Sequence, residues 1–199
     1  MLALGAMLPD FAAMLRERIA TLEHPALLSG AKLHAATDAA FHASPEFVAL
    51  QSAGSARLRA EGVSRGPARA AAHVGIELLV DLSLAATPGA ARDYAEALRA
   101  AALPEVDAAI AWRRADAAPR WRRLQARLLA RGAPEPGARG ETIAARVARA
   151  LSTRPRLALD RAAQRAVAHW LGEASGAVAE ATPALFARVI AATDGVVRL

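Results

Sequence analysis

The chain consists of long apolar runs that glycine and proline residues interrupt. Alanine, which has the highest helix propensity, is abundant in these runs, whereas proline and glycine disfavour helix interiors. No stretch alternates β-branched and polar residues over a length that would predict a strand. The pattern therefore predicts an all-α fold of about eight to nine helices. The expected helices span residues 9–22, 25–43 with Ser29 as an alternative start, 45–61, 64–86, 88–103, 104–116, 119–131, 141–152 and 157–193.

Proline and glycine positions also set the expected helix ends. Pro9 is expected at the first position of the first helix, and Ser44 is expected to cap the helix that Pro45 opens. The interruptions expected within the last segment are Gly172, Gly176 and Pro183. A loop rich in glycine and proline is expected near 132–138. The sequence has no internal repeat, and its 199 residues suit one all-helical domain covering the whole chain, 1–199.

Composition and charge narrow the choice of partners. Hydrophobic residues make up 54% of the chain and aromatic residues 4%, so the core is expected to be mostly Ala, Leu and Val. The formal net charge is +6, but Lys32 is the only lysine and the arginines are scattered among alanines. Nucleic-acid-binding surfaces interleave basic and aromatic residues, and only 112–114 and 120–123 do so here. A solvated helix face accounts for these two segments, so no nucleic-acid partner is expected.

Several classes of protein are excluded by what the sequence lacks. It has no cysteine, which excludes disulfides, thiolate catalysis and cysteine-based zinc sites. The longest apolar run, 74–86, is too short to span a bilayer and contains Glu77 and Asp81. The first ten residues have neither the basic segment nor the cleavage site of a signal peptide. We therefore expect a cytoplasmic protein with no membrane partner.

Residues that can ligate a metal recur at a spacing of four on two of the predicted helices. Residues four apart lie on one helix face, one turn above each other. The two stripes are His34, Asp38 and His42 in the helix at 25–43, and His73, Glu77 and Asp81 in the helix at 64–86. Asp10, at the start of the first helix, is positioned to join them. These seven residues are the predicted metal ligands.

The neighbours of Glu77 and Asp81 support a metal site, because they are almost all apolar. Burying an ionised carboxylate is costly unless it is paired or bound to a metal. No lysine or arginine lies three or four residues from either acid on that helix. A divalent cation would supply the missing charge, and His with carboxylates suits Mn, Fe, Zn or Mg. Of the remaining histidines, His24 is interpreted as a surface or cap residue and His169 as structural.

Several segments, in the same order along the chain, resemble motifs of the acyl carrier protein phosphodiesterases. LGAMLPDF at 4–11 resembles their GN-L-hydrophobic-x-D-F segment, and GAKLHAATD at 30–38 is similar to their G-I-x-x-H-R-x-I-D helix. IELLVDLSL at 76–84 resembles their L-D-hydrophobic-hydrophobic-x-D-H-F-L helix, and ALSTRPRL at 150–157 resembles their M-x-x-R-x-R-L segment. Pro45 lies close to the proline of their T-D-x-x-P segment.

The resemblance implies a fold related to the HD-domain metal hydrolases. It also implies manganese-dependent release of 4′-phosphopantetheine from the serine of holo acyl carrier protein, a carrier in fatty acid biosynthesis. The residues that match the family's acidic and histidine positions are Asp10, His34, Asp38 and Asp81, while Glu77 matches an aspartate. The expected cofactor is therefore a divalent metal, Mn with Fe or Zn as alternatives, and the expected partner is the acidic acyl carrier protein.

The sequence departs from the family's pattern at positions that concern the metal. His42 occupies the place of an aspartate and can still ligate a metal, whereas Leu82 occupies the place of a histidine and cannot. The family's N-terminal A-H-L segment has no counterpart here. His73 has no counterpart in the family, but it lies one turn before Glu77 and could replace the lost ligand.

The implied enzyme is a metal-dependent phosphodiesterase. Its metal would acidify a bound water and stabilise charge on the phosphoryl oxygens, with Asp38 or Glu77 as general base. Alternatives are a metal phosphohydrolase of other specificity, a degenerate homologue that binds the carrier without catalysis, and a basic helical nucleic-acid binder. The arginines that would steer docking of an acidic carrier protein are Arg113, Arg114, Arg122 and Arg123.

Overall fold

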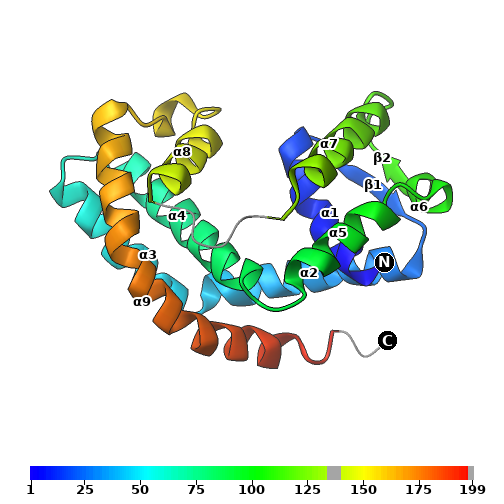
Figure 1. Ribbon diagram of the computed structural model, residues 1–199, viewed down its shortest axis with the longest axis horizontal. Helices are drawn as coiled ribbons and strands as arrows, with labels where there is room; N and C mark the ends of the chain where they lie inside the picture. Colours follow the sequence, from blue (N-terminus) through cyan, green and yellow to red (C-terminus); the bar gives the residue numbers. More distant parts are fainter. Residues whose placement is uncertain (134–139, 197–199) are drawn as a thin grey trace. The chain divides into compact units, whose positions relative to one another are not determined.

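The computed structural model describes residues 1–133 and 140–196, and this part of the chain is mostly helical (Figure 1). The helices are α1 (Leu2–Leu15), α2 (Pro25–Ala43), α3 (Pro45–Ala60), α4 (Arg65–Ala85), α5 (Ala90–Ala100), α6 (Pro104–Ala108), α7 (Ala117–Arg131), α8 (Gly140–Leu151) and α9 (Arg161–Thr193), with a 3₁₀ turn, η1 (Pro155–Leu157). The all-α prediction is confirmed, with nine α-helices in the described residues. Of the loop expected near 132–138, the part from residue 134 onward lies outside the described residues.

The chain forms two compact units. The first unit comprises residues 1–40, 88–134 and 190–199, and the second unit comprises residues 41–87 and 135–189. Each unit is built from segments that are distant in sequence, so each depends on long-range packing. The prediction that the whole chain is one domain stays a prediction.

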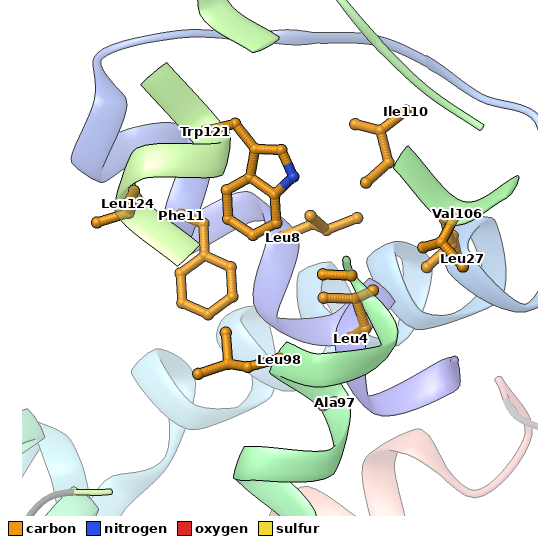
Figure 2. Packing of buried hydrophobic residues seen from close by; sticks show 11 residues of the cluster. Leu4, Leu8, Phe11, Leu27, Ala97, Leu98, Val106, Ile110, Trp121 and Leu124 are labelled. Carbon is orange, nitrogen blue, oxygen red and sulfur yellow. The ribbon is translucent and has the colours of Figure 1, made fainter. Parts of the chain in front are cut away.

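The core of the first unit surrounds Trp121, whose side chain is fully buried (Figure 2). Leu4, Leu8 and Phe11 lie on one face of α1 at helical spacing, and all three are buried. The ring of Phe11 stacks on the indole of Trp121 with centroids 5.4 Å apart. The other buried members of this core are Leu27, Ala97, Leu98, Ala101, Val106, Ile110 and Leu124.

Helix α1 begins at Leu2, so the predicted start at Pro9 is wrong. Pro9 lies inside the helix, where a missing backbone hydrogen bond and a steric clash typically cost about 3 kcal/mol. Leu4 and Leu8 are fully buried, and burying each leucine contributes about 1.5–3 kcal/mol. Leu4 and Leu8 precede the proline and the buried Phe11 follows it, so all three share one face of α1 only if the helix continues on both sides of Pro9. Apolar burial therefore outweighs the local preference.

A short antiparallel sheet in the first unit corrects the prediction that the chain has no strand. β1 (Ile19–Leu22) pairs with β2 (Ile110–Trp112), with Ile19 opposite Trp112. The helices predicted through these segments end earlier, and α1 is closed by Arg16 in the left-handed conformation, with φ of 53°. Strands of three and four residues are too short to show a period-two pattern, so only their pairing reveals them.

Replacing Arg120 with Met is expected to destabilise the protein by about 2–3 kcal/mol, because it removes one partner of a buried ion pair. Arg120 pairs with Glu17, whose side chain is 3% exposed, and donates to the backbone carbonyl of Leu15 at the end of α1. The variant would leave the buried carboxylate with Arg114, 3.5 Å away. Urea denaturation measures the change, with Arg127→Met on the exposed side of α7 as control. Equal losses in the two variants would contradict the argument.

In the second unit, α9 packs Trp170 against α3 and α4. The indole is 5% exposed and lies over Gly54 of α3 and Gly75 of α4. A Cβ atom at Gly75 would lie 2.8 Å from the indole ring, which is closer than van der Waals contact allows. Both glycines are therefore required for the close approach of the three helices.

Helix α9 is continuous, so the predicted division at Gly172, Gly176 and Pro183 is wrong. Gly172 and Gly176 are exposed and a Cβ at either would meet no neighbour within 4 Å, so neither marks a packing constraint. The opposite side of the helix is held by buried residues such as Leu171 and Val178. This burial keeps the helix continuous despite residues that disfavour it locally.

No single helix in the described ranges is long and apolar enough to cross a membrane. Among the described residues, one pair of helices, α4 and α5, meets the criteria of length and composition when taken together, with a bend of 101° between them.

Candidate metal centre

Two histidines and a glutamate from α2 and α4 converge in the second unit. Nε2 of His42 lies 3.2 Å from Nε2 of His73, and Oε1 of Glu77 lies 3.1 Å from each of these nitrogens. The three side chains are between 29% and 35% exposed, so they are partly shielded from water but reachable by an ion. Within residues 1–133 and 140–196 this is the one group of three such side chains whose ligand atoms all lie within 4.8 Å.

The turn between α2 and α3 holds the two imidazole rings in place. Helix α2 ends at Ala43, and the hydroxyl oxygen of Ser44 accepts the backbone N–H of Phe47 at 3.2 Å, as the predicted N-cap. Phe47 is 2% exposed, and its ring stands nearly perpendicular to those of His42 and His73, at centroid distances of 4.9 and 5.2 Å. The imidazoles themselves stack 4.8 Å apart, with 10° between their planes. Packing therefore restricts both rings before any ligand binds.

The charge of Glu77 is set by the histidines beside it. Burial on its own would raise the pKa of this carboxyl group. The hydrogen bonds and charges of His73, and then those of His42, act in the opposite direction and lower the pKa of Glu77 below its ordinary value. Glu77 is thus a carboxylate at neutral pH, which is the form that ligates a cation.

Gln51 of α3 contacts the far side of His73, with its side-chain nitrogen 2.8 Å from Nδ1. Either end of a glutamine amide can face the ring, because the NH₂ group donates to an unprotonated nitrogen and the carbonyl oxygen accepts from an N–H. When Nδ1 carries the proton and donates to the Gln51 oxygen, Nε2 keeps a lone pair directed at His42 and Glu77. A hydrogen bond of this kind orients most metal-ligating histidines.

The residues present fit a divalent metal ion. Ligand atoms that share an ion at bond lengths of about 2.0–2.1 Å lie about 2.9 Å apart in octahedral and about 3.4 Å apart in tetrahedral geometry. The observed separations of 3.1–3.2 Å fall between these values. Two imidazoles and one carboxylate suit Zn, Fe or Mn, and the set of ligands leaves positions for water or substrate. Hydrogen bonds alone would give the same distances, so affinity for metal is the decisive measurement.

The other four predicted ligands lie outside this group. In the first unit, Oδ2 of Asp10 lies 3.9 Å from Nδ1 of His34, and the side chain of Asp10 is 72% exposed. Asp38 lies on α2 one turn before His42, and Asp81 lies on α4 one turn after the glutamate of the centre. Both are exposed. The structure therefore brings together three of the seven residues, and the roles of the others stay predictions.

The two remaining histidines lie elsewhere. His24 accepts the backbone N–H of Ala26 at its Nδ1, 3.1 Å away, at the start of α2, as expected of a cap residue. His169 is exposed on α9, with Glu61 and Glu173 3.3 and 3.5 Å from its ring nitrogens.

The predicted arginine docking surface is already partly neutralised. Arg114 and Arg122 each bind an aspartate, at 3.1 and 2.7 Å. Arg113 and Arg123 have no carboxylate partner among the described residues. Of the four predicted docking residues, these two would therefore present an uncompensated charge to an acidic partner.

Replacing Gln51 with Leu is expected to weaken metal binding by about 10- to 100-fold. The variant removes the contact to Nδ1 of His73, which holds a proton on Nδ1 when the amide presents its oxygen to the ring. Gln51→Glu keeps an acceptor for Nδ1–H and is expected to retain the affinity. Isothermal titration with Zn²⁺ measures both, and Ser52→Ala, an exposed neighbour on α3, is the control. Unchanged affinity in Gln51→Leu would show that His73 needs no such orientation.

Comparison of the chain with protein-family models, with curated proteins and with solved structures finds no match to any of them.

Proposed function

We propose that this protein is a metal-dependent phosphodiesterase whose metal is held by His42, His73 and Glu77. The observation that carries the proposal is the convergence of two imidazole nitrogens and one carboxylate oxygen at 3.1–3.2 Å in one unit. Gln51 and Phe47 add the oriented and packed surroundings that a preformed metal site needs. Three protein ligands leave coordination positions open, as catalytic rather than structural metal sites do.

The chemistry follows from the side chains in and beside the centre. A bound divalent cation supplies positive charge to phosphoryl oxygens and makes water a stronger acid near neutral pH. Glu77 would offset one of the two positive charges of the ion and the neutral imidazoles would offset none, so the site would keep a positive charge for an anionic substrate. Asp38 lies on the part of α2 that belongs to the first unit, so its role as general base stays a prediction from the sequence.

The proposed substrate is holo acyl carrier protein, from which the enzyme would release 4′-phosphopantetheine in the cytoplasm with manganese as cofactor. The support is the ordered resemblance of segments 4–11, 30–38, 76–84 and 150–157 to the acyl carrier protein phosphodiesterases. Leu82, where that family has a histidine, favours two related possibilities, a metal phosphohydrolase of other specificity and a carrier-binding protein without catalysis.

The test combines metal content with turnover. Protein purified without chelators is analysed by elemental mass spectrometry, reloaded with Mn²⁺, Fe²⁺ or Zn²⁺, and incubated with holo acyl carrier protein. Near-stoichiometric metal and formation of apo carrier protein support the proposal in full. Metal binding with hydrolysis of bis(p-nitrophenyl) phosphate alone would redirect it to another phosphodiester. No metal under any of these conditions would overturn it.

A further inference from the structure

A cavity of about 400 Å³ opens beside the metal centre within the second unit. Small-molecule sites have volumes of about 300–1,000 Å³, so the cavity is large enough for a small ligand. His73 and Gln51 line it together with Arg69 of α4, Leu151 of α8, and Arg154 and Leu157 from the segment around η1. His73 therefore belongs both to the cavity wall and to the metal centre, and Gln51, which contacts His73, also lines the cavity.

Two arginines give this cavity a positive charge. Arg69 lies one turn before His73 on α4, on the same helix face. Arg154 lines the same cavity from the segment between α8 and η1. Neither has a hydrogen bond or ion pair to a carboxylate among the described residues. By contrast, Arg57 and Arg188 of the same unit are bound to glutamates.

The rest of the cavity wall is apolar. Leu151 is 2% exposed, and Leu157 and Val74 are half-buried against the same space. An apolar wall with two uncompensated guanidinium groups matches a ligand that has an anionic end and an uncharged organic portion. Guanidinium groups bind phosphate through paired N–H donors, which makes phosphate the favoured anion.

A larger cavity of about 680 Å³ lies elsewhere in the second unit, lined by Arg161, Arg165 and His169 among others. It shares no residue with the metal centre, and the ring nitrogens of His169 already lie beside two glutamates. Volume alone does not identify a site, whereas continuity with a metal centre does, so the smaller cavity is the stronger candidate.

We propose that the cavity beside His73 binds an organic phosphate, with Arg69 and Arg154 holding the phosphate and Leu151, Leu157 and Val74 contacting its apolar portion. This inference rests on the proposed function in one respect, because the phosphate would lie next to the proposed metal. The two arginines, however, attract an anion whether or not a metal is bound, which separates the two proposals experimentally.

The experiment titrates phenyl phosphate and inorganic phosphate into the full chain by calorimetry, with and without saturating Mn²⁺. Arg69→Ala and Arg154→Ala are each expected to weaken phenyl phosphate binding about tenfold in both conditions, because each removes a charge-assisted hydrogen bond. Arg59→Ala, an exposed arginine of α3 that does not line the cavity, is the matched control. Both substituted arginines are exposed, so their removal is expected to leave the fold intact.

A further variant tests the apolar wall. Leu157→Ala is expected to weaken binding of phenyl phosphate about threefold and to leave binding of inorganic phosphate unchanged, because only the phenyl ring contacts the wall. Mn²⁺ binding with no effect of Arg69→Ala or Arg154→Ala on phenyl phosphate would overturn this inference and leave the proposed function standing. Failure to bind Mn²⁺, with tenfold weaker phosphate binding in both variants, would support the cavity assignment and overturn the proposed function.

Discussion

Replacing His73 with Ala is expected to lower the affinity for Zn²⁺ or Mn²⁺ by about 1,000-fold or more. Loss of an outer partner of a metal-bound histidine typically costs about 10–100-fold, so loss of the ligand itself should exceed that range. His73 lies 3.2 Å from His42 and 3.1 Å from Glu77, so its removal takes away one of three ligands that all contact one another. Turnover of any phosphodiester should fall with the metal.

Calorimetry and the metal-induced rise in the unfolding midpoint both measure this loss, since a ligand that binds only the folded state stabilises it. The matched control is His169→Ala, an exposed histidine of the same unit that lies beside glutamates but outside the centre. Circular dichroism before titration establishes that both variants are folded. Equal metal affinity in the wild type, His73→Ala and His169→Ala would mean that the group is a hydrogen-bonded cluster without a metal function.

The sequence predicted the helices that carry the centre with good accuracy. Helix α2 begins at Pro25, one of the two predicted starts, and ends at the predicted Ala43, and Ser44 and Pro45 open α3 as the capping signal required. These helices are bounded by residues whose effect is local, because an N-cap and an N1 proline act on the neighbouring turn alone. Local signals did not predict the ends of α1, because Pro9 lies inside the helix and the residues after it pair as β1, and both features depend on packing with distant segments.

The spacing of the predicted ligands was informative, although the structure brings only three of the seven residues together among those it describes. Four residues exceed one helical turn, so positions at i and i+4 differ by about 40° around the axis, and those at i and i+8 by about 80°. A stripe of three residues therefore turns away from a single partner helix. His42 meets α4 through His73 and Glu77, whereas His34 lies on the part of α2 that belongs to the first unit.

The surroundings of the centre were not predicted, because their residues are unremarkable in the sequence. Phe47 and Gln51 lie four residues apart on α3, and one packs on the imidazoles while the other bonds to Nδ1 of His73. The spacing of four between Phe47 and Gln51 places both on one face of α3, and this spacing could have indicated that α3 also contributes to the site. Arg69 could likewise have been identified, since it continues the stripe of His73 and Glu77 one turn earlier.

Replacing Trp170 with Ala is expected to destabilise the protein by about 3–5 kcal/mol, the usual cost of removing a buried tryptophan side chain. Trp170 is 5% exposed and fills the space between α3 and α4 at Gly54 and Gly75. Chemical denaturation followed by circular dichroism measures the change. Val48→Ala, which truncates a side chain 47% exposed on α3, is the control and is expected to cost less than about 0.5 kcal/mol.

The stronger form of this prediction is a double-mutant cycle between Trp170 and Gly75. Gly75→Ala alone places a Cβ 2.8 Å from the indole and is expected to cost about 1–3 kcal/mol through overpacking. In a background of Trp170→Leu the ring is gone, so the added methyl group fills part of the cavity and the two changes together should cost about 1 kcal/mol less than their sum. Because α3 and α4 carry Gln51, His73 and Glu77, the single Gly75→Ala variant should also bind metal more weakly than the double variant. Strict additivity of the two free energies would mean that the indole does not set the spacing of these helices.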